Sequence, residues 1–316
     1  MLADVLGLGL LRNVMYRQLE ARAPWGLAVS AGRNRSMLYV ITRGQARFEV
    51  AGLAPQVLGA GDVVFLPRDV PHVLRDAPTT VPQLVCDGEQ RATQTARRIG
   101  GRGALTSIVT AFFERSRTPP PLLERPGIVV LSHGDAAVDP QVARTVDLVL
   151  AEVAQPGPAS VVLLQRLVDV LVVHAMRSLA RGSRCQAQRP QGLVALSDPP
   201  IHEALALLHA HVARDWTVAG LAARVGLSRS GFAARFTELV GEPPLQYLAR
   251  WRIARAAEML RNTDEAIGAI AGRVGYESVP SFSKAFKRWQ GTSPGAYRRE
   301  VSSGRDASGV HGLHGR

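Results

Sequence analysis

Short polar and cationic side chains gather after two turn glycines in the last third of the chain. Arg229 and Ser230 follow the first glycine, and Ser281 and Lys284 follow the second. Hydroxyl groups donate and accept hydrogen bonds, whereas guanidinium and ammonium groups only donate, so these side chains suit anionic oxygens and polar ring edges. The sequence shows no Ser/His/Asp set and no pair of carboxylates typical of catalysis. The chemistry that we expect is therefore noncovalent binding.

These side chains belong to a sequence phrase that occurs twice. The first copy is Leu221-Ala-Ala-Arg-Val-Gly226-Leu-Ser228, and the second is Ile270-Ala-Gly-Arg-Val-Gly275-Tyr-Glu-Ser278. Both continue with two phenylalanines, a glycine, a proline and a tyrosine: Phe232, Phe236, Gly241, Pro244 and Tyr247, then Phe282, Phe286, Gly291, Pro294 and Tyr297. The offset is 49 residues up to the glycine (221 to 270) and 50 after it (228 to 278). Such a repeat indicates a repeated supersecondary unit.

Each copy predicts a helix, a tight turn and a second helix. Thr217 can cap the first helix, and Gly226 permits the left-handed conformation that ends it. Ser228 then caps the second helix, and Gly275 and Ser278 hold the same positions in the second copy. The apolar residues expected to lock each pair of helices are Leu221, Val225, Leu227, Phe232 and Phe236, then Ile270, Val274, Tyr276, Phe282 and Phe286.

A long helix is predicted to join the two units, from Pro244 to about Leu260. At about 1.5 Å per residue it forms a rod of roughly 25 Å. With the width of each unit added, the two second helices lie roughly 34 Å apart, which is one turn of B-DNA. The two helices can therefore enter two successive major grooves on one face of a duplex.

The predicted interface divides into two groups. Residues at the start or on the outer face of the second helices are expected to read base edges: Arg229, Ser230, Ala233, Ala234, Val279, Pro280, Ser281, Ser283 and Lys284. Caps and cations near them are expected to contact phosphates: Ser228, Arg235, Arg250, Arg252, Ser278, Lys287, Arg288 and Arg298. Phosphate contacts position a protein on DNA, and base contacts select the sequence.

The segment from Trp216 to Arg299 closely resembles the DNA-binding domain of AraC/XylS-type transcriptional regulators. Its most diagnostic part is the second copy, through Phe282-Ser-Lys-Ala-Phe286-Lys and Gly291-Thr-Ser-Pro294-Gly-Ala-Tyr297-Arg-Arg. The resemblance implies that recognition helices lie within 228–236 and 278–286. The chain departs from the family at Ala233 and Ala234, where longer polar side chains are frequent. Small residues can still touch a thymine methyl group, so base reading is expected to depend on Arg229, Ser230, Ser281, Ser283 and Lys284.

Composition agrees with a polyanionic partner. The chain has 316 residues, a formal net charge of +12 and a pI of about 10.9, and nucleic acid is the commonest partner of such basic proteins. Two cysteines without paired spacing, Cys86 and Cys185, fit a reducing compartment. The longest apolar stretch, 161–175, is too short and too polar to cross a bilayer. No signal peptide is evident, so we expect a cytoplasmic protein with no membrane partner.

Residues up to about 115 alternate short apolar runs with turn signals, which suggests a sandwich or small barrel. The segments Ala23-Pro-Trp-Gly26, 39–44 and 59–67, with His72, resemble the cupin-like sensor domain of one AraC-type subgroup. A barrel mouth suits a small ligand, and the candidate wall residues, each of which can instead be plain core, are Trp25, Tyr39, Phe48, Phe65 and His72. Metal sites need about three protein ligands, and 36–40 lacks the usual cupin set. We therefore expect no metal and no cofactor.

Two helices follow the β region. Asp139 and Pro140 predict the start of the first, and the second, over 160–180, is broadly apolar. Its surplus apolar surface fits a dimer seam or intrachain core, and the sequence leaves both open. The expected domains are a cupin-like sensor and dimerisation domain with its helices over 1–181, a linker over 182–200, a double helix-turn-helix domain over 201–301 and a disordered tail over 302–316.

The sequence thus predicts an α+β fold, with an N-terminal cupin-like barrel or sandwich followed by helices, and an all-α C-terminal domain. The resemblance implies a sequence-specific, non-enzymatic transcriptional regulator that responds to a small molecule. Its expected partners are double-stranded promoter DNA, a second copy and, if it activates transcription, RNA polymerase. The alternatives are a cupin-type enzyme with an appended DNA-binding domain and an architectural DNA-binding protein without sensing. The sequence does not distinguish activation from repression.

Overall fold

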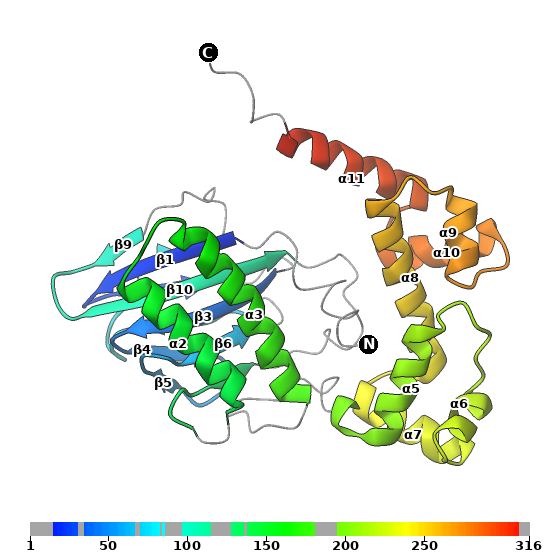
Figure 1. Cartoon of the computed structure of the whole chain (residues 1–316), viewed down its shortest axis with the longest axis horizontal. Helices are drawn as coiled ribbons and strands as arrows, with labels where there is room; N and C mark the ends of the chain where they lie inside the picture. Colours follow the sequence, from blue (N-terminus) through cyan, green and yellow to red (C-terminus); the bar gives the residue numbers. More distant parts are fainter. Residues whose placement is uncertain are drawn as a thin grey trace.

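The computed structural model describes residues 15–30, 35–66, 70–82, 84–85, 97–114, 128–135, 138–180 and 195–309. Two β-sheets with a pair of helices form the N-terminal part, and helices alone form the C-terminal part (Figure 1). The predicted α+β organisation is confirmed.

Two sheets make up the N-terminal part. The larger has the order β11-β6-β3-β10-β1-β9 and comprises β1 (Met15–Arg22), β3 (Arg35–Arg43), β6 (Val63–Leu66), β9 (Arg97–Gly100), β10 (Leu105–Glu114) and β11 (Val129–Leu131). The smaller has the order β5-β4-β7-β2-β8 and comprises β2 (Gly26–Val29), β4 (Ala46–Val50), β5 (Gln56–Leu58), β7 (His72–Arg75) and β8 (Leu84–Val85). Neighbouring strands are antiparallel, except for β1 with β9 and β2 with β8.

The central strand β3 is buried on both faces. Tyr39 and Ile41 belong to the apolar core between the two sheets. Leu38 and Val40 belong to a second core, which lies between the larger sheet and the helices. Side chains alternate across a strand, so a strand covered on both sides has a continuous apolar run.

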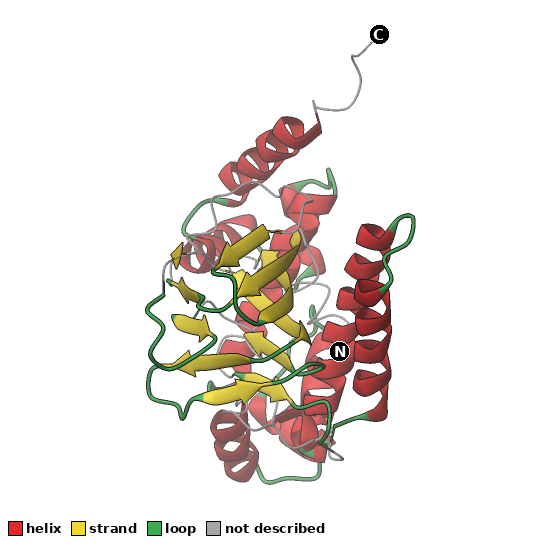
Figure 2. Ribbon diagram, turned by 90° about the vertical axis from the view of Figure 1, so that its left-hand side faces the viewer, coloured by secondary structure: helices red, strands yellow, loops and turns green. Residues whose placement is uncertain are grey.

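A helical hairpin covers the outer face of the larger sheet (Figures 1 and 2). It consists of α2 (Pro140–Ala154) and α3 (Ser160–Ala180), which pack against each other. The Asp139 carboxylate accepts a hydrogen bond from the Gln141 N–H at 2.9 Å, which confirms the predicted start of α2. Buried Val146 on α2 and Val168 on α3 join the same core as the sheet.

The C-terminal part begins earlier than we predicted. It comprises η2 (Ala195–Ser197), α5 (Pro199–Ala210), α6 (Val218–Arg224), α7 (Arg229–Val240), α8 (Pro244–Asn262), α9 (Ile267–Arg273), α10 (Val279–Gln290) and α11 (Pro294–Gly309). We placed residues 182–200 in a linker, but Asp198 caps α5, and Pro199 and Pro200 form its first turn. Proline is tolerated there because the first helical amides have no intrahelical acceptor. The part of the predicted linker before residue 195 lies outside the described residues.

The C-terminal boundary also differs. We expected disorder from Ser302, but α11 continues to Gly309. Tyr297 is buried and Val301 packs against the second apolar core of this domain, so the first turns of α11 are fixed. Extending a helix from a fixed turn is easier than nucleating one. Residues 310–316 lie outside the described residues.

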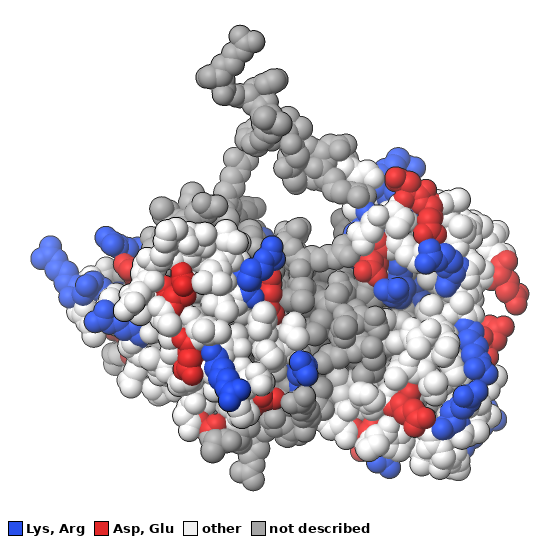
Figure 3. Space-filling model, in the orientation of Figure 1, with Lys and Arg blue, Asp and Glu red and all other residues white. Residues whose placement is uncertain are grey.

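Two surface features bear on partners. Of the helices in the described part of the chain, none combines the length and apolarity that a membrane span requires. On the face shown in Figure 3, Lys and Arg side chains over the C-terminal helices are interspersed with Asp and Glu side chains. On that face, net charge alone does not mark an interface, so the candidate site must be built from individual residues.

Candidate nucleic-acid interface

The first unit positions its outward side chains with two capped helices. The Thr217 hydroxyl accepts a hydrogen bond from the Gly220 N–H at 3.0 Å at the start of α6. Gly226 lies in the left-handed region at φ +69°. Ser228 Oγ then accepts from the Gly231 N–H at 3.1 Å at the start of α7. The predicted helix, turn and helix are confirmed.

The second unit repeats this geometry with one difference. Gly275 makes the turn at φ +85°, and Ser278 Oγ accepts from the Ser281 N–H at 3.4 Å at the start of α10. Helix α9 has no side-chain cap, because Ala266 stands where the first unit has a threonine. The turn glycine and the serine cap of the second helix are therefore alike in both units, whereas the entry to the first helix and the length of the turn differ.

Aromatic rings hold both helix pairs in the same way. The rings of Phe232 and Phe236 lie 5.6 Å apart, and Tyr247 meets Phe236 edge-on at 5.8 Å. The corresponding contacts in the second unit measure 5.6 Å and 5.4 Å. All ten predicted core residues of the two units are buried or partly buried. The repeat in sequence is therefore also a repeat in packing.

The predicted base-reading residues lie mostly on the outer surface. Seven are exposed: Arg229, Ser230, Ala234, Val279, Pro280, Ser281 and Lys284. Ala233 and Ser283 are half-buried. Exposure at the start and outer face of α7 and α10 leaves these side chains accessible to DNA, and their contacts with individual bases stay predictions.

Some of the residues predicted to contact phosphates are exposed, and others are engaged within the protein. Five are exposed: Ser228, Arg235, Ser278, Lys287 and Arg288. Arg235 already has an acidic partner, since its Nε and Nη2 donate to Asp198 Oδ2 at 2.9 Å and 2.6 Å. The same hydrogen bond raises the pKa of Arg235. A phosphate that binds Arg235 must share it with Asp198 or displace that carboxylate.

The predicted phosphate contact is wrong for Arg250. Its side chain is 8% exposed and lies 3.2 Å from the carboxylate of Glu242, which is 10% exposed. Its guanidinium carbon is 5.2 Å from the ring centre of Trp289. Helix α8 is packed by both units, so this position faces protein although arginine is usually a surface residue.

Arg252 and Arg298 are also engaged within the domain. Arg252 donates from Nε to the Val212 carbonyl and from Nη2 to the Arg214 carbonyl, both at 2.9 Å, and burial lowers its pKa. Arg298 donates to the carbonyl of Glu265. Both arginines therefore already use donors within the protein, and their contacts with phosphates stay predictions.

Three of the predicted ligand-pocket residues form one cluster inside the N-terminal core. Tyr39 Oη lies 2.8 Å from His72 Nε2, and His72 Nδ1 lies 2.6 Å from the Val70 carbonyl. A carbonyl only accepts, so in the neutral ring Nδ1 carries the proton and Nε2 accepts from the tyrosine. The Phe48 ring is 5.6 Å from the His72 ring. Among the described residues, no group of three or more His, Cys, Asp or Glu is arranged to hold a metal ion.

The other two predicted pocket residues behave differently. Trp25 is buried in the core between the sheets. The prediction for Phe65 is wrong, because this residue pairs with Leu38 and belongs to the core under the helices. Its neighbour Val64 faces the other sheet instead. A displacement of one position in a strand reverses the face, and the apolar run of β6 does not reveal which face is which.

Two small cavities of about 30 and 100 Å³, both open to solvent, are among those of the N-terminal part. Tyr39 lines the first and Phe48 the second. The first has apolar walls with three polar residues: Leu19, Leu27, Val29, Met37, Tyr39, Ile99 and Phe112, with Arg17, Arg97 and Thr110. The Tyr39–His72–Phe48 cluster therefore contributes a wall residue to each cavity.

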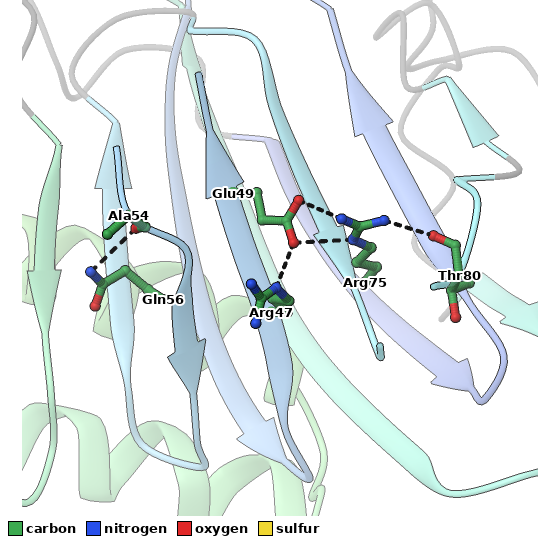
Figure 4. Close-up of polar contacts among 6 residues, drawn as sticks. All are labelled: Arg47, Glu49, Ala54, Gln56, Arg75 and Thr80. Atoms are coloured by element: carbon green, nitrogen blue, oxygen red, sulfur yellow. Dashed lines mark hydrogen bonds and ion pairs between the residues drawn. The ribbon is translucent and has the colours of Figure 1, made fainter. Parts of the chain in front are cut away.

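An ion-pair cluster on β4 and β7 stabilises the smaller sheet (Figure 4). Glu49 accepts from Arg75 Nη2 at 2.7 Å and from Arg47 Nε at 2.6 Å. Arg75 Nη1 also donates to the Thr80 carbonyl at 3.1 Å. The hydrogen bond from Arg75, opposed by burial and assisted by the one from Arg47, lowers the pKa of Glu49.

Known proteins resemble both parts of the chain. Residues 1–181 match the family model of cupins, and residues 221–300 match that of a helix-turn-helix domain. A Streptomyces lividans protein named as an AraC-like transcription regulator is 34% identical over 303 residues, which cover 94% of this chain and 97% of that protein. The chain belongs to the AraC-type transcriptional regulators.

Two further proteins are similar to this chain or to part of it. The regulator AlkR of Acinetobacter baylyi is 28% identical over 293 residues, covering 90% of this chain and 94% of AlkR. The solved DNA-binding domain of AdpA, in complex with a target DNA, is 36% identical, covers 35% of this chain and 98% of its own, and has a TM-score of 0.33. The two family models and the Streptomyces relative show that this AraC-type chain has the DNA-binding domain and the cupin-like domain that the sequence predicted.

Sequence reasoning missed two acidic residues of this AraC-type chain. Asp198 holds Arg235, and Glu242 holds Arg250. The Asp-Pro-Pro sequence at 198–200 is a helix-start signal that points to Asp198. Glu242 lies in the turn between α7 and α8 with no local signal, and only the packing of α8 shows its partner.

Proposed function

We propose that this AraC-type regulator binds promoter DNA by placing α7 and α10 in two successive major grooves. The observation that carries the proposal is the pair of serine-capped helices with matching ring contacts, one at each end of α8. Their accessible polar residues are assigned to base reading: Arg229, Ser230, Ser281, Ser283 and Lys284. Lys287 and Arg288 on α10 supply phosphate contacts.

A binding titration of the full chain on the DNA upstream of its own gene tests this function. One segment should bind more tightly than random DNA, by about 10³-fold or more at physiological salt. The affinity should also fall steeply as salt rises, because phosphate contacts release counterions. Equal affinity for random DNA, with and without metabolites, contradicts the proposal.

We also propose that the first cavity binds the effector. Its apolar walls suit a hydrocarbon body, and the guanidinium groups of Arg17 and Arg97 suit an acidic group. An apolar carboxylic acid combines the two. Binding in the cupin-like domain then shifts how the double helix-turn-helix domain is presented.

Thermal unfolding with a series of apolar carboxylic acids of increasing chain length tests the effector class. A matching acid should raise the melting temperature and change DNA affinity, and Arg97→Ala should abolish both effects. Arg98→Ala is the matched control, because Arg98 is 85% exposed and pairs with Glu20 instead of lining the cavity. Melting shifts that are equal in the two variants, or that leave DNA affinity unchanged, rule out this cavity as the sensor.

A second copy is proposed to dock on the helical hairpin. Four large apolar side chains of the hairpin are exposed to solvent: Leu148, Val162, Leu163 and Val170, with exposed fractions of 56%, 56%, 47% and 43%. Val170→Asp should shift the full chain towards the monomer in light scattering, because a charge on an apolar seam is costly. Val57→Asp is the control, since Val57 is 63% exposed on β5, in the smaller sheet. An unchanged mass for Val170→Asp excludes this seam.

Regulation by this chain is proposed to occur in the cytoplasm and without catalysis. Its relatives are transcription regulators. If the chain activates transcription, it is expected to contact RNA polymerase. About one equivalent of iron or manganese in the purified protein would contradict the non-enzymatic assignment, because a metal-dependent cupin enzyme retains its metal.

A further inference from the structure

The two helix-turn-helix units have separate apolar cores. Helix α8 contributes Leu248 and Trp251 to the core of the first unit and Ile253 and Leu260 to that of the second. In Figure 1, α8 runs between α6 and α7 at one end and α9 and α10 at the other. The angle between the units therefore depends on α8 and on whatever contacts cross it.

Arg250 makes one of these crossing contacts. It pairs with Glu242, in the turn that ends the first unit, with N–O distances of 3.2 Å and 3.3 Å. Its guanidinium also lies over the ring of Trp289, near the end of α10 in the second unit. Both Arg250 and Glu242 are at most 10% exposed, so water screens this contact poorly.

Arg252 makes a second crossing contact. Its two donated hydrogen bonds hold the carbonyls of Val212 and Arg214, which follow α5 in the first unit. Its guanidinium carbon lies 5.9 Å from the ring centre of Tyr276, in the turn of the second unit. The adjacent Gly275 backbone passes so close that an added Cβ would lie 2.8 Å from Ala213 Cα. The two arginines thus give α8 two anchor points in each unit.

On the basis of the DNA-binding function proposed above, we propose that Arg250 and Arg252 are positioning residues that fix the angle between α7 and α10, and thereby select the spacing of the two DNA half-sites. The selection follows from geometry. One inserted base pair moves the second half-site by about 3.4 Å and turns it by about 35° around the duplex. If the junction between the two units is rigid, α10 cannot follow this movement of the second half-site. If the junction is loosened, α10 can follow it.

Binding of the full chain to targets with lengthened spacing tests the proposal. The targets carry the selected half-sites at native spacing or with one or two inserted base pairs. The native chain should lose on the order of 10–100-fold in affinity for each insertion, comparable to the cost of one or two wrong base pairs. Arg252→Lys, and the double variant Glu242→Gln with Arg250→Met, should reduce the loss to about threefold. The double change avoids leaving a buried charge without its partner.

Arg255→Met is the matched control, because Arg255 lies on the same helix but pairs with Glu258, three residues along α8. It should keep the full spacing penalty. Affinity for DNA with a single half-site, measured for every variant, reports on the fold of each unit and should stay within about twofold. A folded junction variant that retains the native spacing penalty overturns the proposal. So does a parallel loss on every target, the single half-site included, because that outcome shows a merely structural role.

Discussion

At the scale of the residue, the two recognition helices differ in what they present. Helix α7 has small side chains at Ala233 and Ala234, whereas α10 has Ser283 and Lys284 at the matching positions. Three of the arginines that we predicted at phosphates instead hold a carboxylate or backbone carbonyls. Residue type alone therefore does not show which arginines are already engaged within the protein.

Removal of Lys284 is expected to weaken DNA binding more than removal of any outward side chain of α7 except Arg229. A good base contact contributes about 1–3 kcal/mol, so Lys284→Ala should lower specific affinity by roughly 5–150-fold, measured by fluorescence anisotropy. Ser230→Ala is the comparison on α7 and should cost less. The ranking is wrong if changes at Ser230, Ala233 and Ala234 dominate specificity.

Glu49 gives a pH-dependent prediction. Its pKa is lowered in the folded state, so the stabilisation is complete above the unfolded pKa and is lost as pH falls through the folded value. Glu49→Gln should lower the melting temperature at pH 7. The difference from the native chain should close in acid, below the ordinary glutamate pKa of about 4.3. If the difference in melting temperature stays constant from pH 7 down to acidic pH, the effect of the substitution is due to packing and not to the charge of Glu49.

At the scale of the element, the two helix-turn-helix turns are alike in backbone and different in surroundings. Gly226 and Gly275 both have positive φ. Nothing lies within 4 Å of a Cβ built on Gly226, whereas a Cβ on Gly275 would be 2.7 Å from Arg252 Nη2 and 2.8 Å from Ala213 Cα. The second turn is therefore also part of the junction between units.

Substitution of alanine for each of these two glycines should separate the backbone role of the turn from its packing role in the junction between the units. Gly226→Ala should lower the free energy of unfolding by about 1–2 kcal/mol, because a residue with a side chain is strained in the left-handed conformation. Gly275→Ala should cost about 1–3 kcal/mol more, because overpacking is added to that strain. Denaturant unfolding of the full chain measures both. Equal costs contradict the close contact between Gly275 and Ala213.

At the scale of the whole molecule, the short helix η2 connects the two domains. It contacts α3 of the N-terminal domain and α5 and α7 of the C-terminal domain. The next residue is Asp198, which caps α5 and holds Arg235 on α7. A movement of α3 can therefore reach a recognition helix through one short segment.

Asp198→Asn should strengthen DNA binding in the absence of effector. Asparagine keeps the cap but no longer competes as an anion for Arg235, so one more phosphate contact becomes available. The slope of log affinity against log salt should steepen by about 0.9. Asp264→Asn, at an exposed position in the same domain, controls for the loss of one negative charge. An unchanged slope excludes a phosphate role for Arg235.

The sequence by itself determined the repeat, its caps, its turns and its phenylalanine cores, because these depend on residues close together in the chain. It also determined the α+β order and the family. It did not reveal β1, whose sequence Met-Tyr-Arg-Gln-Leu-Glu-Ala-Arg has few apolar residues and which pairs with β10 about 90 residues later.

Tertiary structure alone decided which face of a strand Phe65 occupies and which arginines are engaged within the protein. Both depend on partners far away in sequence: the helical hairpin for Phe65, Trp289 for Arg250, and the turn after α5 for Arg252. Local sequence patterns record the period of a helix or strand but not what covers each side. Burial by distant elements decided whether an arginine side chain stays on the surface or joins two protein units.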